Sequence, residues 1–346
     1  DLYELIDSTY TTDDTFVVAF GKFMTALTKE FGLVFFSPGD LEVKRMAAGF
    51  FKSILNKQDE LHQRFVDTNF KIKKEGYHIQ VEKKDNATHL FYNLNGRTPV
   101  LRDNNHFTVG GEHFSIEELC DCIDNHPERF SPDVMTRPIL QSFLFPVVSQ
   151  LGGASEIAYL AQTNQIFNLF DRVTPFYKAR PSITILEKRF EKLMTEHDIK
   201  FEEIAKDIEQ VINRILSKTF PEDIETNFDG LRKQIKSHFE KFSSKTLEFD
   251  PALMSFAKQT LGKIDFSLKA FEGKVFSAHK KKSKESRERI YRLWHSVYPN
   301  RNFQERAINI SYFLSKYGLN IIKYLYENID TEEKAHQIIH LKDIKE

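Results

Sequence analysis

The feature that most constrains the fold is a pair of glycines between an apolar run and a helical pattern. Residues 145–149 form a short apolar strand pattern that ends in a turn at Gly152 and Gly153, and a helix is predicted to open at Ser155-Glu156. A second strand is predicted over the β-branched residues 183–185. Strand, glycine turn, helix and strand in this order are typical of a doubly wound α/β domain, in which ligands bind where strands end and helices begin. The stretch therefore predicts a fold class and the place of a site.

Composition narrows the classes of partner. The chain has 346 residues, enough for about two domains. With 49 basic and 50 acidic residues, it has no overall charge that would favour nucleic acid or an anionic membrane. No apolar run approaches the roughly 20 residues of a membrane-spanning helix, and the first residues lack a secretory leader. We therefore expect a cytoplasmic protein without a nucleic-acid or membrane partner, and a chain cut from a longer one.

Cysteine and histidine usage predicts no metal site. Cys120 and Cys122 are the only cysteines, and they fall on different faces of a predicted helix. The histidines show none of the spacings that hold a metal ion. Reduced cysteines that serve as packing residues fit a cytoplasmic location.

The first half of the chain is predicted to be an α/β core with an insertion. Residues 1–75 give one core portion: a helix over 12–31 capped by Thr12 or Asp13, a strand over 32–36, a turn at 37–40, and a helix to about residue 69. Residues 76–128 contain short β-like runs at 77–81, 89–92, 98–101 and 106–109, separated by turn signals, and predict a small β-rich insertion. Residues 129–186 are the second half of the core.

The second half of the chain is predicted to be helical. Residues 187–284 carry three apolar stripes at helical spacing, which we interpret as an antiparallel helical hairpin with a third helix, a coiled-coil domain. Residues 285–346 form a C-terminal helical segment, in which one helix opens at 304–306, Gly318 closes it, and a final helix starts at 319–320.

The glycine turn is the strongest local candidate for a binding site. Gly152 and Gly153 would let a substrate approach the backbone, and the helix that follows offers free N–H groups to an anion or a hydroxyl. Glu156, in the first turn of that helix, could bind a cationic amine. The alternative is a plain turn in which Glu156 only offers a charge favourable to the helix dipole.

Further polar residues flank this turn. Tyr159 and Gln162 follow Glu156 in steps of three and share roughly one helix face, where they could bind a polar ligand or pack on the sheet. Arg137 and Gln141 precede the strand, and Arg137 could hold a carboxylate through two hydrogen bonds or form a structural ion pair. Arg180, before the next predicted strand, has the same two interpretations.

A second polar cluster lies near the end of the chain. Beside a proline turn it contains Tyr298, Asn300, Gln304, Glu305 and Arg306. Such a density of polar residues indicates a pocket or a junction between domains, and the residues alone do not choose between them.

Several of these motifs together resemble one family. They are Asp85-Asn-Ala-Thr-His-Leu-Phe91, Gly110-Gly-Glu-His-Phe-Ser115, Arg129-Phe-Ser-Pro-Asp133, Arg137-Pro, Gln141, Gly152-Gly153, Glu156-Ile-Ala-Tyr159, Arg180-Pro-Ser182, Tyr298-Pro-Asn, Gln304-Glu-Arg306 and Lys316-Tyr-Gly318. Spread in order over nearly the whole chain, they resemble the bacillithiol biosynthesis cysteine-adding enzyme family, BshC. The resemblance implies a Rossmann-like core similar in plan to class I aminoacyl-tRNA synthetases, with insertions and a long coiled-coil domain. Family members are longer, so the first part of that core is expected upstream of Asp1.

The resemblance also implies an activity. It implies a ligase that joins the carboxyl of L-cysteine to the glucosamine amine of glucosaminyl malate, using ATP or another nucleotide, with Arg137 a candidate for binding malate. The amphipathic helices are expected to form a homodimer. No catalytic residue is identified. The rival hypothesis is a non-catalytic interaction protein that binds a nucleotide or a sugar, and the polar residues around Glu156 favour the enzyme.

Overall fold

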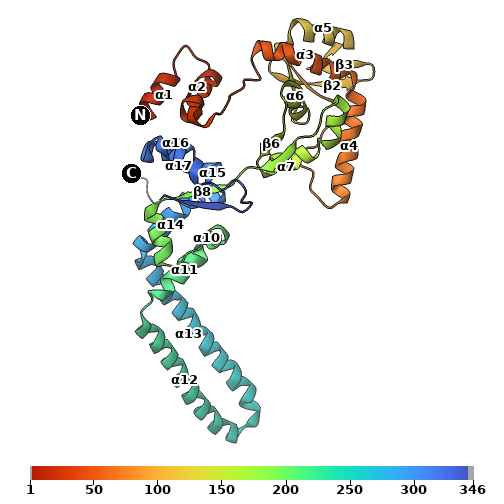
Figure 1. Cartoon of the computed structure of the whole chain (residues 1–346). Helices are drawn as coiled ribbons and strands as arrows, with labels where there is room; N and C mark the ends of the chain where they lie inside the picture. The colour runs from red at the N-terminus through yellow and green to blue at the C-terminus, as the bar shows by residue number, and fades with distance from the viewer. Residues whose placement is uncertain (1, 342–346) are drawn as a thin grey trace. The chain divides into compact units, whose positions relative to one another are not determined.

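The computed structural model describes residues 2–341, which divide into two compact units. The first contains residues 3–181 together with 330–335, and the second contains residues 182–329 together with the segment that starts at His336. Figure 1 shows the helices and strands of each unit. Within the part of the chain that is described, no helix has the length and apolar character needed to span a membrane. The five-segment division of the sequence stays a prediction.

Two helices open the chain, and a side chain caps the start of the second one. α1 (Leu2–Thr9) is followed by α2 (Phe16–Thr28), whose N-cap is Thr15, and by the short 3₁₀ helix η1 (Lys29–Phe31). The cap therefore lies later than the predicted Thr12 or Asp13. The strand predicted over residues 32–36 is wrong, because this segment has no strand partner among the described residues and Val34 is 91% exposed.

The next helix was predicted as one but is two. α3 (Leu41–Asn56) begins at Asp40, whose carboxylate accepts hydrogen bonds from the N–H groups of Glu42 and Val43. The chain leaves helical geometry at Lys57, and α4 (Gln58–Lys74) follows. The break lets both helices bury aromatic side chains, Phe50 and Phe51 from α3 and Phe65 from α4, in one core.

A five-stranded antiparallel sheet follows, in the order β4-β3-β2-β1-β5. Its strands are β1 (Ala87–Asn93), β2 (Arg97–Asp103), β3 (His106–Val109), β4 (Glu112–Phe114) and β5 (Phe130–Pro132). The runs predicted near 89–92, 98–101 and 106–109 are confirmed as strands, whereas the strand predicted at 77–81 is wrong, and β4 and β5 were missed. α5 (Ile116–Asn125) begins with a capping box made by Ser115 and Glu118, and η2 (Pro127–Arg129) precedes β5.

The stretch around the glycine pair folds as a parallel strand–helix–strand unit. Its elements are α6 (Arg137–Leu144), β6 (Ser149–Gly152), α7 (Ala154–Ala161), α8 (Asn164–Phe167), η3 (Asn168–Phe170) and β7 (Phe176–Ala179), and β6 pairs in parallel with β7. The strand predicted at 145–149 is wrong by about four residues, because only residues 149–152 lie opposite a partner strand. The partner of β6 is β7, which the sequence did not reveal, and not the strand at 183–186.

That later strand belongs to the second unit. β8 (Ile183–Leu186) pairs in parallel with β9 (Gln337–His340), near the other end of the chain. Between them lie α9 (Lys188–Glu196), α10 (Phe201–Lys206), α11 (Ile208–Lys218), α12 (Glu222–Phe249), η4 (Pro251–Leu253), α13 (Met254–Lys282), α14 (Lys284–Val297), η5 (Pro299–Arg301), α15 (Gln304–Ala307), α16 (Ile310–Tyr317) and α17 (Asn320–Asn328).

The predicted helical hairpin is confirmed. α12 and α13 pack side by side and run in opposite directions (Figure 1), with Phe228 of α12 against Phe271 of α13. Phe220, which precedes α12, packs against Phe276 of α13. Much of the apolar surface of the hairpin faces outward: Phe242, Phe256 and Phe266 are 65%, 68% and 73% exposed. The packed core of this unit lies instead among α9, α10, α11 and α14.

Candidate functional site

The glycine turn joins β6 to α7 without any spare space. Gly153 donates its N–H to the Glu156 carboxylate at 2.7 Å, and a Cβ on Gly152 would lie 2.9 Å from Cβ of Glu156. The carbonyl of Gly152 accepts the backbone N–H of Arg180, which follows β7. In this structure Glu156 therefore caps the helix, and Gly152 allows close packing. A role of Gly152, Gly153, Glu156 or Arg180 in binding substrate stays a prediction.

A cavity of about 660 Å³ lies in the same unit, against α3 and α6. Three cations line it: Lys44 from α3, Arg97 from β2 and Arg137 from α6. The other lining residues are mostly apolar, and the described lining contains no Asp or Glu: Phe36, Pro38, Gly39, Val43, Ala47, Phe51, Ser131, Pro132, Leu140, Gln141, Leu144 and Phe145. A concave apolar surface with a few convergent polar groups is typical of a small-molecule site, and the three cations favour an anion.

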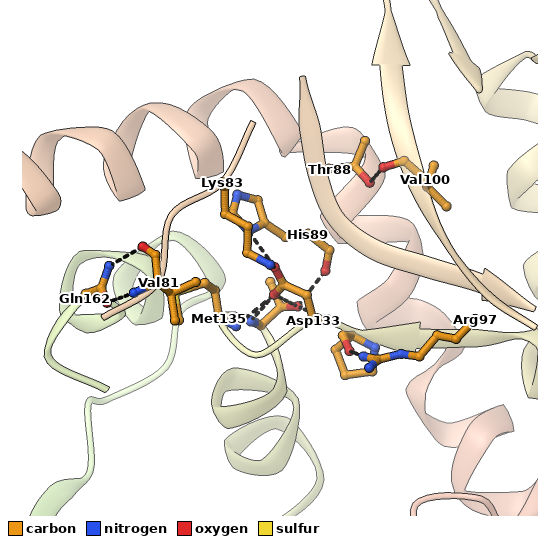
Figure 2. A network of polar contacts seen from close by, with 11 residues as sticks. Val81, Lys83, Thr88, His89, Arg97, Val100, Asp133, Met135 and Gln162 are labelled. Atoms are coloured by element: carbon orange, nitrogen blue, oxygen red, sulfur yellow. Dashed lines mark hydrogen bonds and ion pairs between the residues drawn. The ribbon is translucent and has the colours of Figure 1, made fainter. Parts of the chain in front are cut away.

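Two of the cations are held by the backbone of β5. The Lys44 ammonium donates to the Phe130 carbonyl, and burial followed by the nearby charge of Arg97 lowers the pKa of Lys44. Arg97 lies 4.0 Å from the centre of the Phe91 ring and donates to the Pro132 carbonyl at 2.8 Å. Figure 2 shows Arg97 reaching the strand in this way. An anion in the cavity would relieve the mutual repulsion of Lys44 and Arg97.

The third cation connects the cavity to the glycine turn. Arg137, the first residue of α6, donates to the Tyr159 hydroxyl on α7 at 3.3 Å. Gln141, one turn further along α6, accepts a hydrogen bond at 3.2 Å from Gln150 on β6. Three of the residues singled out in the sequence, Arg137, Gln141 and Tyr159, are thus brought together. Lys44 and Arg97 were missed, because nothing in their local sequence distinguishes them from surface cations.

Gln162 has a different position. Its side-chain oxygen accepts the N–H of Val81 at 3.0 Å, and its side-chain nitrogen donates to the Val81 carbonyl at 2.9 Å and to Asn69 at 2.7 Å. Figure 2 shows this two-way clamp on Val81. Because its amide is fully occupied and 1% exposed, Gln162 has no donor left for a ligand in this arrangement.

The second predicted cluster lies along the edge of β8 in the other unit. Gln304 clamps Ile185 as Gln162 clamps Val81, accepting its N–H at 2.8 Å and donating to its carbonyl at 2.9 Å. Glu305 accepts the N–H of Ile183 and lies 3.7 Å from Arg306. Tyr298 packs edge-on against Phe201, and Asn300 adopts a left-handed conformation in the turn. The contacts of Gln304 and Glu305 complete the edge of β8.

The structure also contains a buried polar network whose residues were not among the predicted site residues. Asp133 accepts hydrogen bonds from the backbone of Met135 and Thr136, lies 3.0 Å from Nδ1 of His89, and pairs with Lys83 at 2.8 Å (Figure 2). Burial would raise the pKa of Asp133, but His89 and Lys83 outweigh it and lower the pKa to about 2. His89 has a left-handed backbone, with φ of 64° in an irregular part of β1, and a fully buried ring. The network links β1 to β5, and we assign it a structural role.

Across residues 2–341, no three His, Cys, Asp or Glu side chains lie close enough together to hold a metal ion. The free thiols Cys120 and Cys122 are partly buried on α5.

Comparison with known proteins identifies both units. Residues 1–181 match the family model described as the BshC N-terminal Rossmann-like domain of bacillithiol biosynthesis, and residues 183–341 match its C-terminal coiled-coil domain. These matches confirm the predicted fold class, a Rossmann-like core portion with a long helical coiled-coil domain.

Individual relatives give the same result. A protein of Koribacter versatilis (strain Ellin345) named "Putative cysteine ligase BshC" is 29% identical over 342 residues, which are 98% of this chain and 64% of that protein. Relatives of the same name from Bacillus cereus (strain ZK / E33L) and Bacillus thuringiensis (strain Al Hakam) are 28% and 27% identical over 348 residues. The chain spans 64% of the length of each of these relatives. Since the two family models together match almost all of its sequence, the chain belongs to the bacillithiol biosynthesis BshC family.

Proposed function

We propose that the protein is a cytoplasmic cysteine ligase of bacillithiol biosynthesis, which joins L-cysteine to the glucosamine amine of glucosaminyl malate. Membership of a family whose relatives are named as cysteine ligases supports the reaction class. The observation that carries the substrate is the cavity lined by Lys44, Arg97 and Arg137 without a carboxylate in its described lining. Malate brings two carboxylates, and arginine is well suited to bind such planar anions through paired hydrogen bonds.

The cavity residues would bind and orient the acceptor. Arg97 is fixed by Phe91 and by β5, so its remaining N–H donors have a defined direction. Arg137 donates a hydrogen bond to Tyr159 on α7. A carboxylate that bound Arg137 in place of Tyr159 would break this link to α7. Holding the malate end in place positions the acceptor amine, and such positioning lowers the barrier of a bimolecular reaction.

The chemistry itself forms one amide bond. The acceptor amine attacks the activated carboxyl carbon of cysteine, the activating group leaves with its bonding electrons, and the amine gives up a proton. The nucleophile must be the neutral amine, which requires a base. We assign none of the described residues to that role.

A nucleotide is the activating co-substrate we propose, with ATP as the choice that fits a ligase with a Rossmann-like domain. Its chemistry would be adenylation of the cysteine carboxyl. The glycine turn does not provide a phosphate cradle on its own, since the N–H of Gly153 is already bonded to Glu156. We therefore assign nucleotide binding to none of the residues of this turn.

The rival hypothesis of a non-catalytic interaction protein is not favoured by the names of the relatives. Association is nevertheless part of the proposal. The outward-facing Phe242, Phe256 and Phe266 on the hairpin would be covered in a homodimer formed through α12 and α13. Light scattering should then give the mass of a dimer, and Phe266→Glu should shift it toward that of a monomer.

The ligase proposal is tested by replacing Arg137 with lysine. The protein, expressed with its natural flanking sequence in a strain that lacks the enzyme, should restore bacillithiol as measured by mass spectrometry. In purified enzyme, Arg137→Lys should raise KM for glucosaminyl malate by about tenfold, because lysine cannot form the paired contact. Arg45→Lys is the matched control, since Arg45 on α3 is not among the residues that line the cavity and pairs at the surface with Glu42.

Two results would contradict the proposal. Accumulation of glucosaminyl malate in cells that express the wild-type protein would mean that the reaction is not catalysed. An unchanged KM for glucosaminyl malate in Arg137→Lys, with full bacillithiol synthesis, would remove the cavity from substrate binding.

A further inference from the structure

A second cavity, of about 570 Å³, lies between α4, α7 and the extended segment that follows α4. Its lining shares no residue with the cavity that Lys44, Arg97 and Arg137 line. The residues that line it are Thr68, Lys71, Ile72, Glu75, Tyr77, His78, Gln80, Ala158, Ala161, Asn164 and Gln165. None of them belongs to the site proposed for the ligase.

One wall of this cavity is fixed at both ends. At the end of α4, Gly76 has φ of 82° and donates to Lys73, while the Tyr77 N–H reaches back to the Ile72 carbonyl at 3.1 Å. This pattern is a Schellman-type helix end. Four residues later, Gln162 clamps both backbone groups of Val81. The side chains of Tyr77, His78 and Gln80 are therefore carried by a short segment anchored on either side.

The floor of the cavity is made by small side chains. Ala158 and Ala161 are three residues apart on α7 and share one face, whereas Tyr159 between them reaches Arg137. A larger residue at position 158 would fill the space. The hollow is thus a consequence of the alanines and of the anchored segment.

The rim offers hydrogen-bonding groups that the protein does not use. Across residues 2–341, no side-chain hydrogen bond or ion pair is formed by Lys71, Glu75, His78, Gln80, Asn164 or Gln165. The three amide side chains, Gln80, Asn164 and Gln165, supply both donors and acceptors, and the positive charge of Lys71 is balanced by the negative charge of Glu75. The Tyr77 residue is 72% exposed beside them. The rim is consequently polar, balanced in charge and furnished with an aromatic ring.

We propose that this cavity binds a neutral, hydroxyl-rich small molecule, namely a saccharide. Hydroxyl groups both donate and accept, so they match amide side chains, and the C–H face of a sugar ring can cover the exposed Tyr77 ring. A polyanion is disfavoured by the negative charge of Glu75. The cavity size lies within the range of ordinary ligand sites. The inference stands apart from the proposed ligase function.

The test uses methyl α-D-glucopyranoside as the probe and the full chain as the protein. Saturation-transfer NMR should show binding of the glucoside. Tyr77→Ala removes the aromatic ring, and Ala158→Leu fills the floor of the cavity. Each should lower the affinity for the glucoside by about tenfold or more. Tyr326→Ala and Ala270→Leu, at exposed positions of α17 and α13, are the matched controls and should bind as the wild type does. Thermal unfolding of every variant shows whether it is folded.

Three results would overturn the inference. The first is absence of glucoside binding to folded wild-type protein up to the solubility limit of the sugar. The second is binding that both Tyr77→Ala and Ala158→Leu leave unchanged while they remain folded. The third is binding of L-serine instead, with both variants abolishing it, which would make the cavity an amino-acid site. Loss of ligase activity in any of these variants does not enter the test, since the readout is binding of the glucoside.

Discussion

A buried carboxylate in the second unit and a group of cations around a cavity in the first unit differ in the partners they have. In the second unit, Glu187 is completely buried and accepts hydrogen bonds from Tyr312 at 2.9 Å, from Tyr317 at 3.1 Å and from the Lys316 ammonium. In the first unit, Lys44, Arg97 and Arg137 surround a cavity whose described lining has no carboxylate. A carboxylate whose hydrogen-bonding partners all come from the protein stabilises the fold. Cations without a carboxylate beside them are available to an anionic ligand. This difference is the reason why we propose the first unit as the one that binds an anionic substrate.

The largest effect is expected at Glu187. Burial alone would raise the pKa of Glu187, but the Lys316 and Tyr312 hydrogen bonds outweigh it and lower that pKa. Glu187→Gln would remove the buried carboxylate charge that pairs with Lys316, at a cost of about 3–5 kcal/mol in the free energy of unfolding. Urea unfolding measures this loss, and hydrogen exchange should locate it in α9 and α16.

Its matched control is Glu196→Gln. Glu196 belongs to a surface pair with Lys192 at 3.8 Å, and such pairs contribute about 0–1 kcal/mol. If both variants lost the same stability, the network around Glu187 would not have the structural role given to it.

A smaller effect, dependent on pH, is expected in the first unit. The pKa of Asp133 is about 2 in the folded protein, below the ordinary value of 3.8. A carboxylate with a lowered pKa stabilises the fold above its unfolded pKa, and this contribution is lost as pH falls from about 4 toward about 2. The shift corresponds to about 2 kcal/mol. Urea unfolding of the wild type at about pH 5 and about pH 2.5 should show the loss.

Asp133→Asn provides the comparison for that measurement. This variant should already be destabilised at pH 5 and should lose less on acidification than the wild type does. Asp124→Asn, which changes an exposed partner of Lys52, should follow the wild-type dependence. Equal acid dependence in wild type and Asp133→Asn would show that another group is responsible.

The helices and strands show what local sequence can and cannot predict. Asp40 before α3 and the Ser115–Glu118 capping box mark helix starts through residues within one turn, so they were predictable. The hairpins from β1 to β3 follow from turn residues such as Gly96. β7 and β9 were missed because each pairs in parallel with a distant strand, and nothing nearby in the sequence identifies the partner.

The candidate site was predictable only in part, for the same reason. Arg137 and Gln141 precede the glycine turn and were recognised from that position. Lys44 and Arg97 come from α3 and β2, and only the packing of these elements around β5 places them beside Arg137. Glu156 was predicted to bind a substrate amine, and this stays a prediction; in the structure its carboxylate accepts the Gly153 N–H.

The two glutamine clamps permit a direct comparison of the units. Gln304 pairs with Ile185 inside a buried strand, whereas Gln162 pairs with Val81 on a partly buried segment. Gln304→Met should therefore cost about 2–3 kcal/mol and Gln162→Met about 1–2 kcal/mol, because an unsatisfied backbone group is costlier where water cannot reach it. Thermal unfolding gives both values. A larger loss in Gln162→Met would reverse this ranking.

The smallest change in stability, with a clear change in binding, is expected at Lys44. Burial and the charge of Arg97 already lower the pKa of Lys44, so Lys44→Met removes an unfavourable charge and should leave the unfolding free energy nearly unchanged. The same substitution removes one of three cations from the cavity. It should lower the affinity for glucosaminyl malate by about tenfold, as measured by calorimetry. The affinity of the variant should also depend less steeply on salt concentration. Arg45→Met, on the neighbouring position of α3, is the control and should retain wild-type affinity. A stabilised Lys44→Met variant with unchanged affinity would mean that the unpaired cations of the first unit are not there for an anion, and the contrast with Glu187 would lose its functional meaning.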